Sequence, residues 1–185
     1  MKHVKKSVLL WYSAREMYGL VTAVELYPGF LPWCERADVV EQHADGMTAC
    51  LHLHYAGLRH AFTTRNGHQT DSVVTMTLVN GPFSVLDGTW RFLPIGSGGS
   101  GGSGGMGGMG GMGGMGGAGG VGGVGGAGGT AGAVPAASAC RVEFDLRYAF
   151  SSRALETVLS PVFDRVANTF VDSFVQRAEQ VYGVR

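Results

Sequence analysis

A tract of glycine pairs limits which parts of this chain can fold. Between Gly96 and Ala139 the sequence carries no charged residue and holds 24 of the 32 glycines. Such a segment offers no periodic apolar face to a core. We therefore predict a single domain over residues 1–185, in which residues 96–139 form a disordered Gly-Gly-x insertion in the hairpin between the last two strands. A methionine-bearing arm that touches a partner is the alternative interpretation.

The rest of the chain carries all of the charge and all of the cysteines. The 14 basic and 14 acidic side chains balance, so the basic excess that drives non-specific nucleic-acid binding is missing and we expect no DNA partner. Cys34, Cys50 and Cys140 are odd in number and far apart, which argues against a disulfide framework and against a zinc site. A reducing cytoplasm is the expected location, and no stretch reaches the ~20 apolar residues of a membrane span.

Turn signals separate a series of strand candidates. After a first strand over residues 4–11, Ser13 and Glu16 match the Ser-x-x-Glu capping box of a helix, which must end before Pro28. Turn dipeptides such as Asn66-Gly67 then bound a meander of antiparallel strands. We predict strands over residues 36–43, 47–55, 58–65, 73–79 and 83–93, the last with a bulge at Gly88.

Two strands and one helix show their buried faces in the sequence. Apolar side chains occupy the odd positions of residues 47–55 and the even positions of residues 140–150, so one face of the sheet is buried. From Ser152 onward the apolar period becomes three or four, which indicates a helix. We predict a short helix, a kink, and a long helix over residues 161–182 with Ser160 as its N-cap. The order of elements predicts an α+β fold.

Candidate catalytic groups are weak. His52 and His54 share a strand face, as do Glu143 and Asp145, but both faces are the outward ones. Exposed polar pairs explain them better than a zinc site or an acid/base dyad. The sequence contains no nucleophile elbow and no phosphate loop. We therefore expect no enzyme activity, no metal and no catalytic cofactor.

Large apolar side chains are the remaining candidates for function. The stretch YPGFLPWC, residues 27 to 34, sets four of them on a loop that two prolines stiffen. Others face the concave side of the predicted sheet or lie on the long helix. Either they fill a solid core, or the loop covers a binding tunnel. The candidates for binding are Tyr27, Phe30, Leu31, Trp33, Leu53, Tyr55, Trp90, Phe144, Tyr148, Phe163, Phe170 and Phe174.

Several segments together carry a family resemblance. They are YSAREMYGLVTAVELYPGFLPWC (12 to 34), FTTRN (62 to 66), LVNGPF (78 to 83), GTWRF (88 to 92) and CRVEFDLRYAF (140 to 150), with a closing RAEQVYGVR. The chain resembles the bacterial ribosome-association toxins and the coenzyme-Q-binding START-like proteins of mitochondria, in the polyketide cyclase/SRPBCC family. It departs from the family pattern at Ala23, where Asp is frequent, and in the glycine tract.

The resemblance implies a helix-grip fold, in which a seven-stranded curved antiparallel sheet surrounds a long C-terminal helix and leaves a lipid-sized tunnel. It implies two functions. One is binding of ubiquinone (coenzyme Q) or a similar prenyl lipid in support of respiratory electron transport, with peripheral contact at the inner membrane. The other is binding of the 50S ribosomal subunit, which blocks subunit association and is opposed by a small antitoxin protein. On the first function, Tyr27, Phe30, Leu31 and Trp33 form the rim of the tunnel.

The glycine tract gives a direct test of the domain assignment. Replacing residues 96–139 with a short turn should change the melting temperature by no more than a few degrees, because lengthening a hairpin loop from ~5 to ~44 residues costs only about 2 kcal/mol of closure entropy. Thermal unfolding of the shortened and full chains measures the difference. A larger loss of stability would mean that the tract packs on the domain.

Overall fold

The structure, a computed structural model, describes residues 1–96 and 139–185. The predicted disorder of the glycine tract lies outside the described residues. Seven strands form one antiparallel sheet in the order β1-β7-β6-β5-β4-β3-β2. The strands are β1 (Lys2–Leu10), β2 (Cys34–His43), β3 (Gly46–Tyr55), β4 (Leu58–Gln69), β5 (Val73–Asn80), β6 (Phe83–Ile95) and β7 (Ala139–Phe150).

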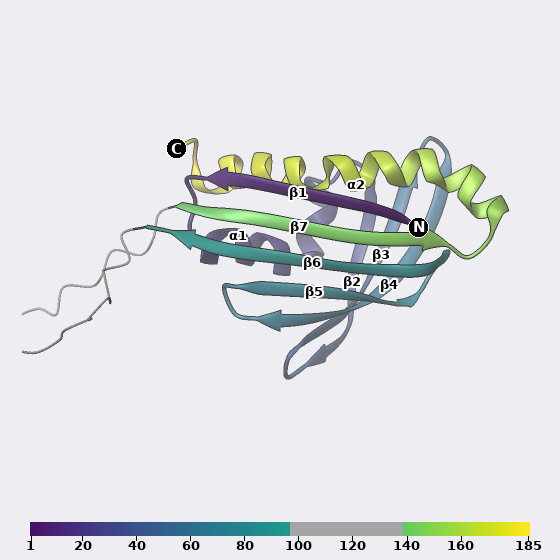
Figure 1. Cartoon of the computed structure of the whole chain (residues 1–185), viewed down its shortest axis with the longest axis horizontal. Coiled ribbons are helices and arrows are strands. Elements are labelled where there is room, and N and C mark those ends of the chain that lie inside the picture. The colour runs from purple at the N-terminus through teal and green to yellow at the C-terminus, as the bar shows by residue number, and fades with distance from the viewer. Residues whose placement is uncertain (97–138) are drawn as a thin grey trace, which may run out of the picture. The chain divides into compact units, whose positions relative to one another are not determined.

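Two α-helices lie on one face of this sheet. They are α1 (Ala14–Thr22) and α2 (Arg153–Tyr182), and a 3₁₀ helix, η1 (Val24–Gly29), links α1 to β2. The long helix α2 runs along β1 and β7, and α1 lies beside it on the same side of the sheet (Figure 1). The predicted α+β helix-grip fold is confirmed, with the core between the concave face of the sheet and α2.

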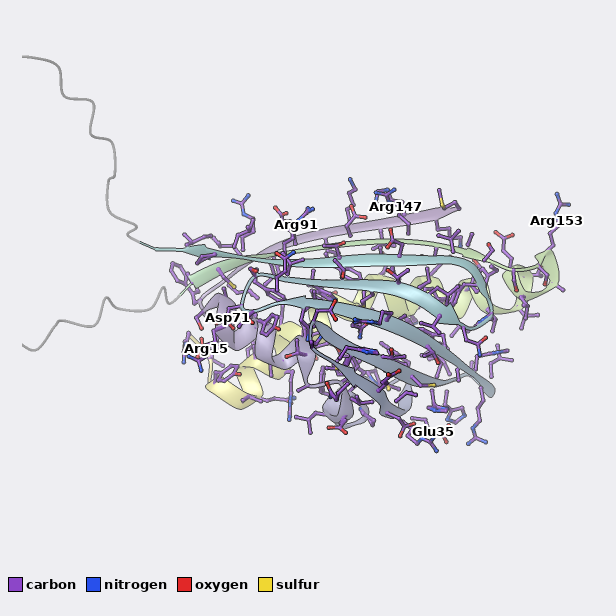
Figure 2. All side chains as sticks on the ribbon, turned by 90° about the horizontal axis from the view of Figure 1, so that it is seen from below. Arg15, Glu35, Asp71, Arg91, Arg147 and Arg153 are labelled. Carbon is purple, nitrogen blue, oxygen red and sulfur yellow. The ribbon has the colours of Figure 1, made fainter. Side chains whose placement is uncertain are left out.

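Local sequence rules explain where the elements begin and which faces they bury. Ser13 caps α1 as predicted, since the Glu16 amide donates to the Ser13 hydroxyl at 3.1 Å and the Ser13 amide donates to the Glu16 carboxylate at 2.7 Å. The odd positions of β3 and the even positions of β7 point into the core, as their alternation predicts. Charged side chains such as Arg91 and Arg147 project from the opposite face (Figure 2).

The structure corrects two turn and bulge predictions. Asn66-Gly67 is not a turn, because β4 continues to Gln69 and Gly67 pairs with Gly46 of β3 and with Thr75 of β5. Pairing on both sides outweighs the local turn signal. Gly88 is not a bulge either, since its pairing with Leu146 is regular and the register shift lies between Phe83 and Val85. A Cβ at Gly88 would lie 2.5 Å from the Met76 methyl carbon, so the glycine permits close packing instead.

The predicted division of the C-terminal helix is also wrong. Helix α2 is continuous from Arg153 to Tyr182 with Pro161 inside it, and Ser152 is its N-cap, accepting a hydrogen bond from the Leu155 amide at 3.2 Å. A proline removes one hydrogen bond, but the helix continues on both sides of it, and the turns that follow it bury Phe163 and Val166 against the sheet. The helix bends near its N-terminal end (Figure 1), which agrees with a kink and not with a break.

One polar cluster ties the first strand and β7 to the N-terminal half of α2. Lys2 of β1 donates hydrogen bonds to Ser160 and Asp164 of α2, and the Tyr148 hydroxyl of β7 donates to the same Asp164 carboxylate. Burial would raise the pKa of Asp164, but the hydrogen bonds from Lys2 and Tyr148 prevail and hold the pKa below its usual value. The ionised carboxylate therefore stabilises the fold.

Asp164→Asn should lower the free energy of unfolding by about 1 kcal/mol near neutral pH, a modest value because the pair is partly exposed to solvent. A carboxylate whose pKa is depressed by folding stabilises the protein above its unfolded pKa of about 3.9 and loses that contribution as the pH falls through the folded pKa. Urea unfolding should thus show a larger difference near pH 7 than at about pH 3. The control is Asp172→Asn, which lies on the same helix as Asp164 and removes a 3.7 Å ion pair with Lys6 of β1. An equal difference at both pH values would contradict the assignment.

Candidate functional site

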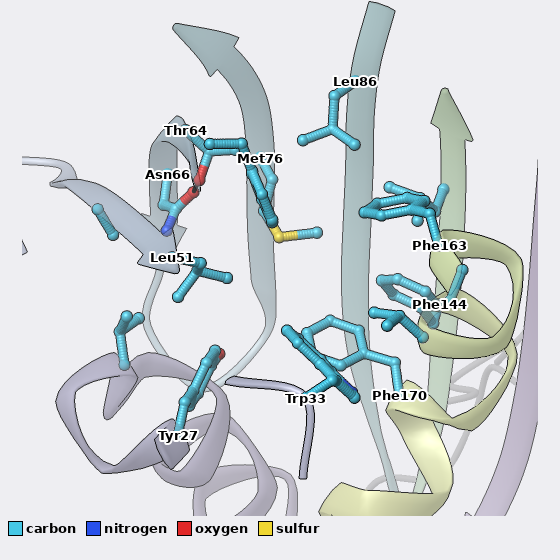
Figure 3. A pocket seen from close by; sticks show the side chains of 16 residues that line it. Tyr27, Trp33, Leu51, Thr64, Asn66, Met76, Leu86, Phe144, Phe163 and Phe170 are labelled. Carbon is cyan, nitrogen blue, oxygen red and sulfur yellow. Dashed lines mark hydrogen bonds between the residues drawn. The ribbon is translucent and has the colours of Figure 1, made fainter. Parts of the chain in front are cut away.

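An apolar cavity lies between the concave face of the sheet and α2. The space between its lining atoms is about 580 Å³ including the open mouth, of which the centre of a water molecule can occupy about 50 Å³. A cavity of this size holds a few water molecules but no drug-sized ligand without movement of the wall. Sixteen residues line it (Figure 3): Val24, Tyr27, Trp33, Ala49, Leu51, Phe62, Thr64, Asn66, Met76, Leu86, Phe144, Leu146, Phe163, Val166, Ala167 and Phe170.

Helix α2 supplies one wall of the cavity. Four of its residues line the cavity at spacings of three, one and three, which places them on one face of the helix: Phe163, Val166, Ala167 and Phe170. The small side chain of Ala167 leaves room between the larger ones. The helical period that predicted α2 therefore also determines which of its residues meet the cavity.

The segment that contains YPGFLPWC closes another side. Pro28 lies within η1, so the predicted stiff loop is in part a 3₁₀ helix. Tyr27 and Trp33 are buried and line the cavity, and the Tyr27 hydroxyl donates to the Val21 carbonyl at 2.6 Å. Phe30 is only half-buried, and the Arg177 guanidinium lies 5.5 Å from its ring centroid. This segment is mainly a core element with one ring at the surface.

A pair of polar side chains interrupts the apolar lining. The Thr64 hydroxyl donates to the Asn66 amide oxygen at 2.8 Å, and the two residues are 3% and 6% exposed. Both lie on the buried face of β4, in phase with Phe62. Asn66 lies beyond the predicted end of this strand at residue 65, and Thr64, inside the predicted strand, is not one of the large apolar side chains taken as candidates. The alternation Phe62, Thr64, Asn66 was the signal that could have found them.

The predicted binding residues divide into groups. Five line the main cavity, namely Tyr27, Trp33, Phe144, Phe163 and Phe170. Leu53 and Tyr55 border a second, smaller cavity, which Phe163 also lines. Four residues are buried in the core and line neither of these two cavities: Leu31, Trp90, Tyr148 and Phe174. Phe30 is partly buried and packs against the edge of the core. Their role in binding a ligand stays a prediction.

Trp90 shows why burial alone does not make a residue part of the cavity. Its ring centroid lies 4.4 Å from that of Phe144, 5.5 Å from Phe170 and 5.2 Å from Phe174. Rings at these distances are in contact and leave no space for a ligand between them. Trp90 therefore packs against two residues that line the cavity, Phe144 and Phe170, without lining it.

The cavity lining carries almost no ionisable chemistry. Among the described residues that line it, Tyr27 alone can ionise, and burial, with a smaller contribution from Cys34, raises its pKa far above the usual value. Burial also raises the pKa of the Cys34 thiol to about 11, so it remains protonated at neutral pH. All three cysteines are free, and no metal-binding group of three His, Cys, Asp or Glu side chains occurs within residues 1–96 and 139–185. This lining is suited to holding an apolar molecule.

Similarity to known proteins covers most of the chain. A family model described as polyketide cyclase / dehydrase and lipid transport matches residues 10–175. The ribosome association toxin RatA of Pseudomonas aeruginosa is 32% identical over 181 residues, 98% of either chain. The mitochondrial coenzyme Q-binding protein COQ10 of Drosophila melanogaster is 31% identical over 90 residues, which cover 48% of this chain and 37% of that protein.

Comparison with solved structures supports the same fold. A START superfamily protein from Mycobacterium smegmatis superposes with a TM-score of 0.65 at 14% identity, over 97% of this chain and 98% of that one. At this identity the likeness concerns the fold alone. It confirms the helix-grip fold expected from the sequence. No helix in the described parts of the chain is both long and apolar enough to cross a bilayer.

The different burial of Trp33 and Phe30 gives a mutational test. Trp33→Ala should lower the free energy of unfolding by about 3 to 5 kcal/mol, because it empties a buried site. Phe30→Ala should cost only about 1 to 2 kcal/mol, because the ring is half-buried. Chemical denaturation of both variants measures the two losses. Similar small losses would show that Trp33, like Phe30, belongs to a loosely packed rim.

Proposed function

The chain belongs to the polyketide cyclase / dehydrase and lipid transport family, and we propose that it binds ubiquinone or a similar prenyl lipid in the cavity beneath α2. One observation carries this proposal: a cavity with an apolar wall and a single internal polar pair lies between the sheet and the helix. A prenyl quinone has the matching character, an apolar tail with a small polar ring. The partial similarity to a coenzyme Q-binding protein supports the same ligand class.

The hydrophobic effect provides enough affinity for such a ligand. Burial of one five-carbon isoprene unit contributes roughly 3 to 4 kcal/mol at the usual value per buried methylene. Two or three buried units then correspond to micromolar binding or better after the cost of association. The wall needs no charged group to reach this affinity.

Binding requires the cavity to widen, and the structure indicates where. Phe163 lies between the main cavity and the second one, and both cavities are bordered by the N-terminal half of α2. Pro161 weakens hydrogen bonding within that half. Movement of Phe163 would join the two spaces into one tunnel. We propose that the ligand is held there as cargo and that the protein catalyses no reaction on it.

A second function is supported by the full-length similarity to the ribosome association toxin. On this hypothesis the chain binds the 50S subunit, prevents subunit association, and is itself bound by a small antitoxin. The contact would use the outer surface, where charged side chains such as Arg91 and Arg147 project (Figure 2). The interior cavity and the outer surface allow the two functions to be tested separately.

The quinone hypothesis predicts that organic extraction of the purified protein yields ubiquinone. Ala167→Leu should weaken binding of added ubiquinone about tenfold or more, because three further heavy atoms occupy the cavity. Ala154→Leu makes the same change at an exposed position of α2 and should bind like the parent. Tryptophan fluorescence titration measures the affinities. Absence of quinone in the extract, together with equal binding by both variants, would refute the proposal.

The ribosome hypothesis predicts that overexpression shifts sucrose-gradient profiles from 70S particles to free subunits, with the protein in the 50S fractions. Ala167→Leu should leave this shift intact, because it alters only the interior. An unchanged profile at high expression would remove this function for the chain. Loss of the shift in Ala167→Leu but not in Ala154→Leu would instead show that the cavity and the ribosomal surface are coupled.

A further inference from the structure

The hydrogen bond between Thr64 and Asn66 fixes the direction of an amide inside the cavity. The Asn66 oxygen accepts the Thr64 hydroxyl proton at 2.8 Å, so the amide nitrogen is turned the other way. Figure 3 shows the oxygen facing Thr64 and the nitrogen pointing away from it. Among residues 1–96 and 139–185 no side-chain or main-chain acceptor receives a hydrogen bond from this nitrogen. An N–H donor of the cavity lining is left without a partner among the described residues.

A second donor, on the side of the cavity closed by the segment that contains YPGFLPWC, is also unpaired. Trp33 is 3% exposed, and its indole nitrogen has no hydrogen-bond partner within the described residues. The other hydroxyl in the lining, that of Tyr27, already donates to the Val21 carbonyl. The indole nitrogen of Trp90, which lies outside the cavity lining, is unpaired as well, so an unpaired indole alone does not mark a binding site. Buried polar groups in folded proteins nearly always find partners, and the Asn66 amide is the unpaired donor that a second lining residue orients. What the cavity lacks is a hydrogen-bond acceptor.

We infer that Thr64 and Asn66 form a donor site that holds a carbonyl oxygen of the ligand, and that the cavity therefore selects prenyl ligands with an acceptor-only head group such as an oxidised quinone. Thr64 is a positioning residue, because its hydroxyl orients the Asn66 amide. This inference rests on the proposed function and makes it more specific. A carboxylate head group fits poorly, since the lining has no cation to pair with it.

The test compares two probes with the same tail in the full-length protein. A ubiquinone with two isoprene units carries ring carbonyls, and geranylbenzene carries none. The wild-type chain should bind the quinone at least tenfold more tightly than the hydrocarbon. Asn66→Leu removes the donor at similar volume, so it should weaken quinone binding about tenfold and leave hydrocarbon binding within about twofold. Asn80→Leu, at an exposed position at the end of β5, should change neither affinity.

Further variants protect the test against simple misfolding. Asn66→Met removes the N–H group with an uncharged side chain of similar size, and it should also lose quinone binding while its melting temperature stays close to that of the parent. Thr64→Val should weaken quinone binding by a smaller factor. If the wild-type chain binds neither probe, both the inference and the proposed function fail. If all folded variants bind the quinone as well as the parent does, the donor site is wrong and the proposed function stands.

Discussion

The contact between Phe174 of α2 and Trp90 of β6 is the interaction on which the rest of the site depends. The two ring centroids lie 5.2 Å apart, and neither side chain is exposed. Through Phe170, which lies 5.3 Å from Phe174, the same packing reaches the cavity wall. The C-terminal half of α2 is thus held firmly on the sheet, while its N-terminal half borders open space. A helix fixed at one end and loosely packed at the other can admit a ligand without unfolding.

Much of the fold was predictable because strand alternation and helical period report burial directly. The buried faces of β3 and β7 and the cap at Ser13 followed from local sequence alone. The errors share one cause, which is that tertiary pairing outweighed a local signal. Gly67 reads as a turn residue, but strands on both sides hold it in β4. Pro161 reads as a helix start, yet α2 is continuous through it, with Leu159 before it and Phe163 after it both buried.

The candidate site was less predictable than the fold. Alternation shows that Trp90 and Phe144 both point inward, but it does not show that Phe144 meets the cavity and Trp90 does not. That difference arises from contacts between residues far apart in sequence, above all those with α2. The polar residues were missed for another reason. Thr64 and Asn66 are polar, so they are not among candidates chosen for large apolar side chains. Their spacing nevertheless places them on the buried face of β4.

Three departures from good packing coincide in one part of the molecule. An unfilled space, a buried polar pair and an unpaired indole N–H all occur at the main cavity. Leucine or valine at positions 64 and 66 would be expected to pack the space and remove the polar groups from the core. Elsewhere in the described chain the local sequence pattern and the tertiary packing conflict at single positions such as Gly67 and Pro161, away from the cavity lining. Departures that gather at one cavity are typical of functional sites, where a loss of stability is tolerated.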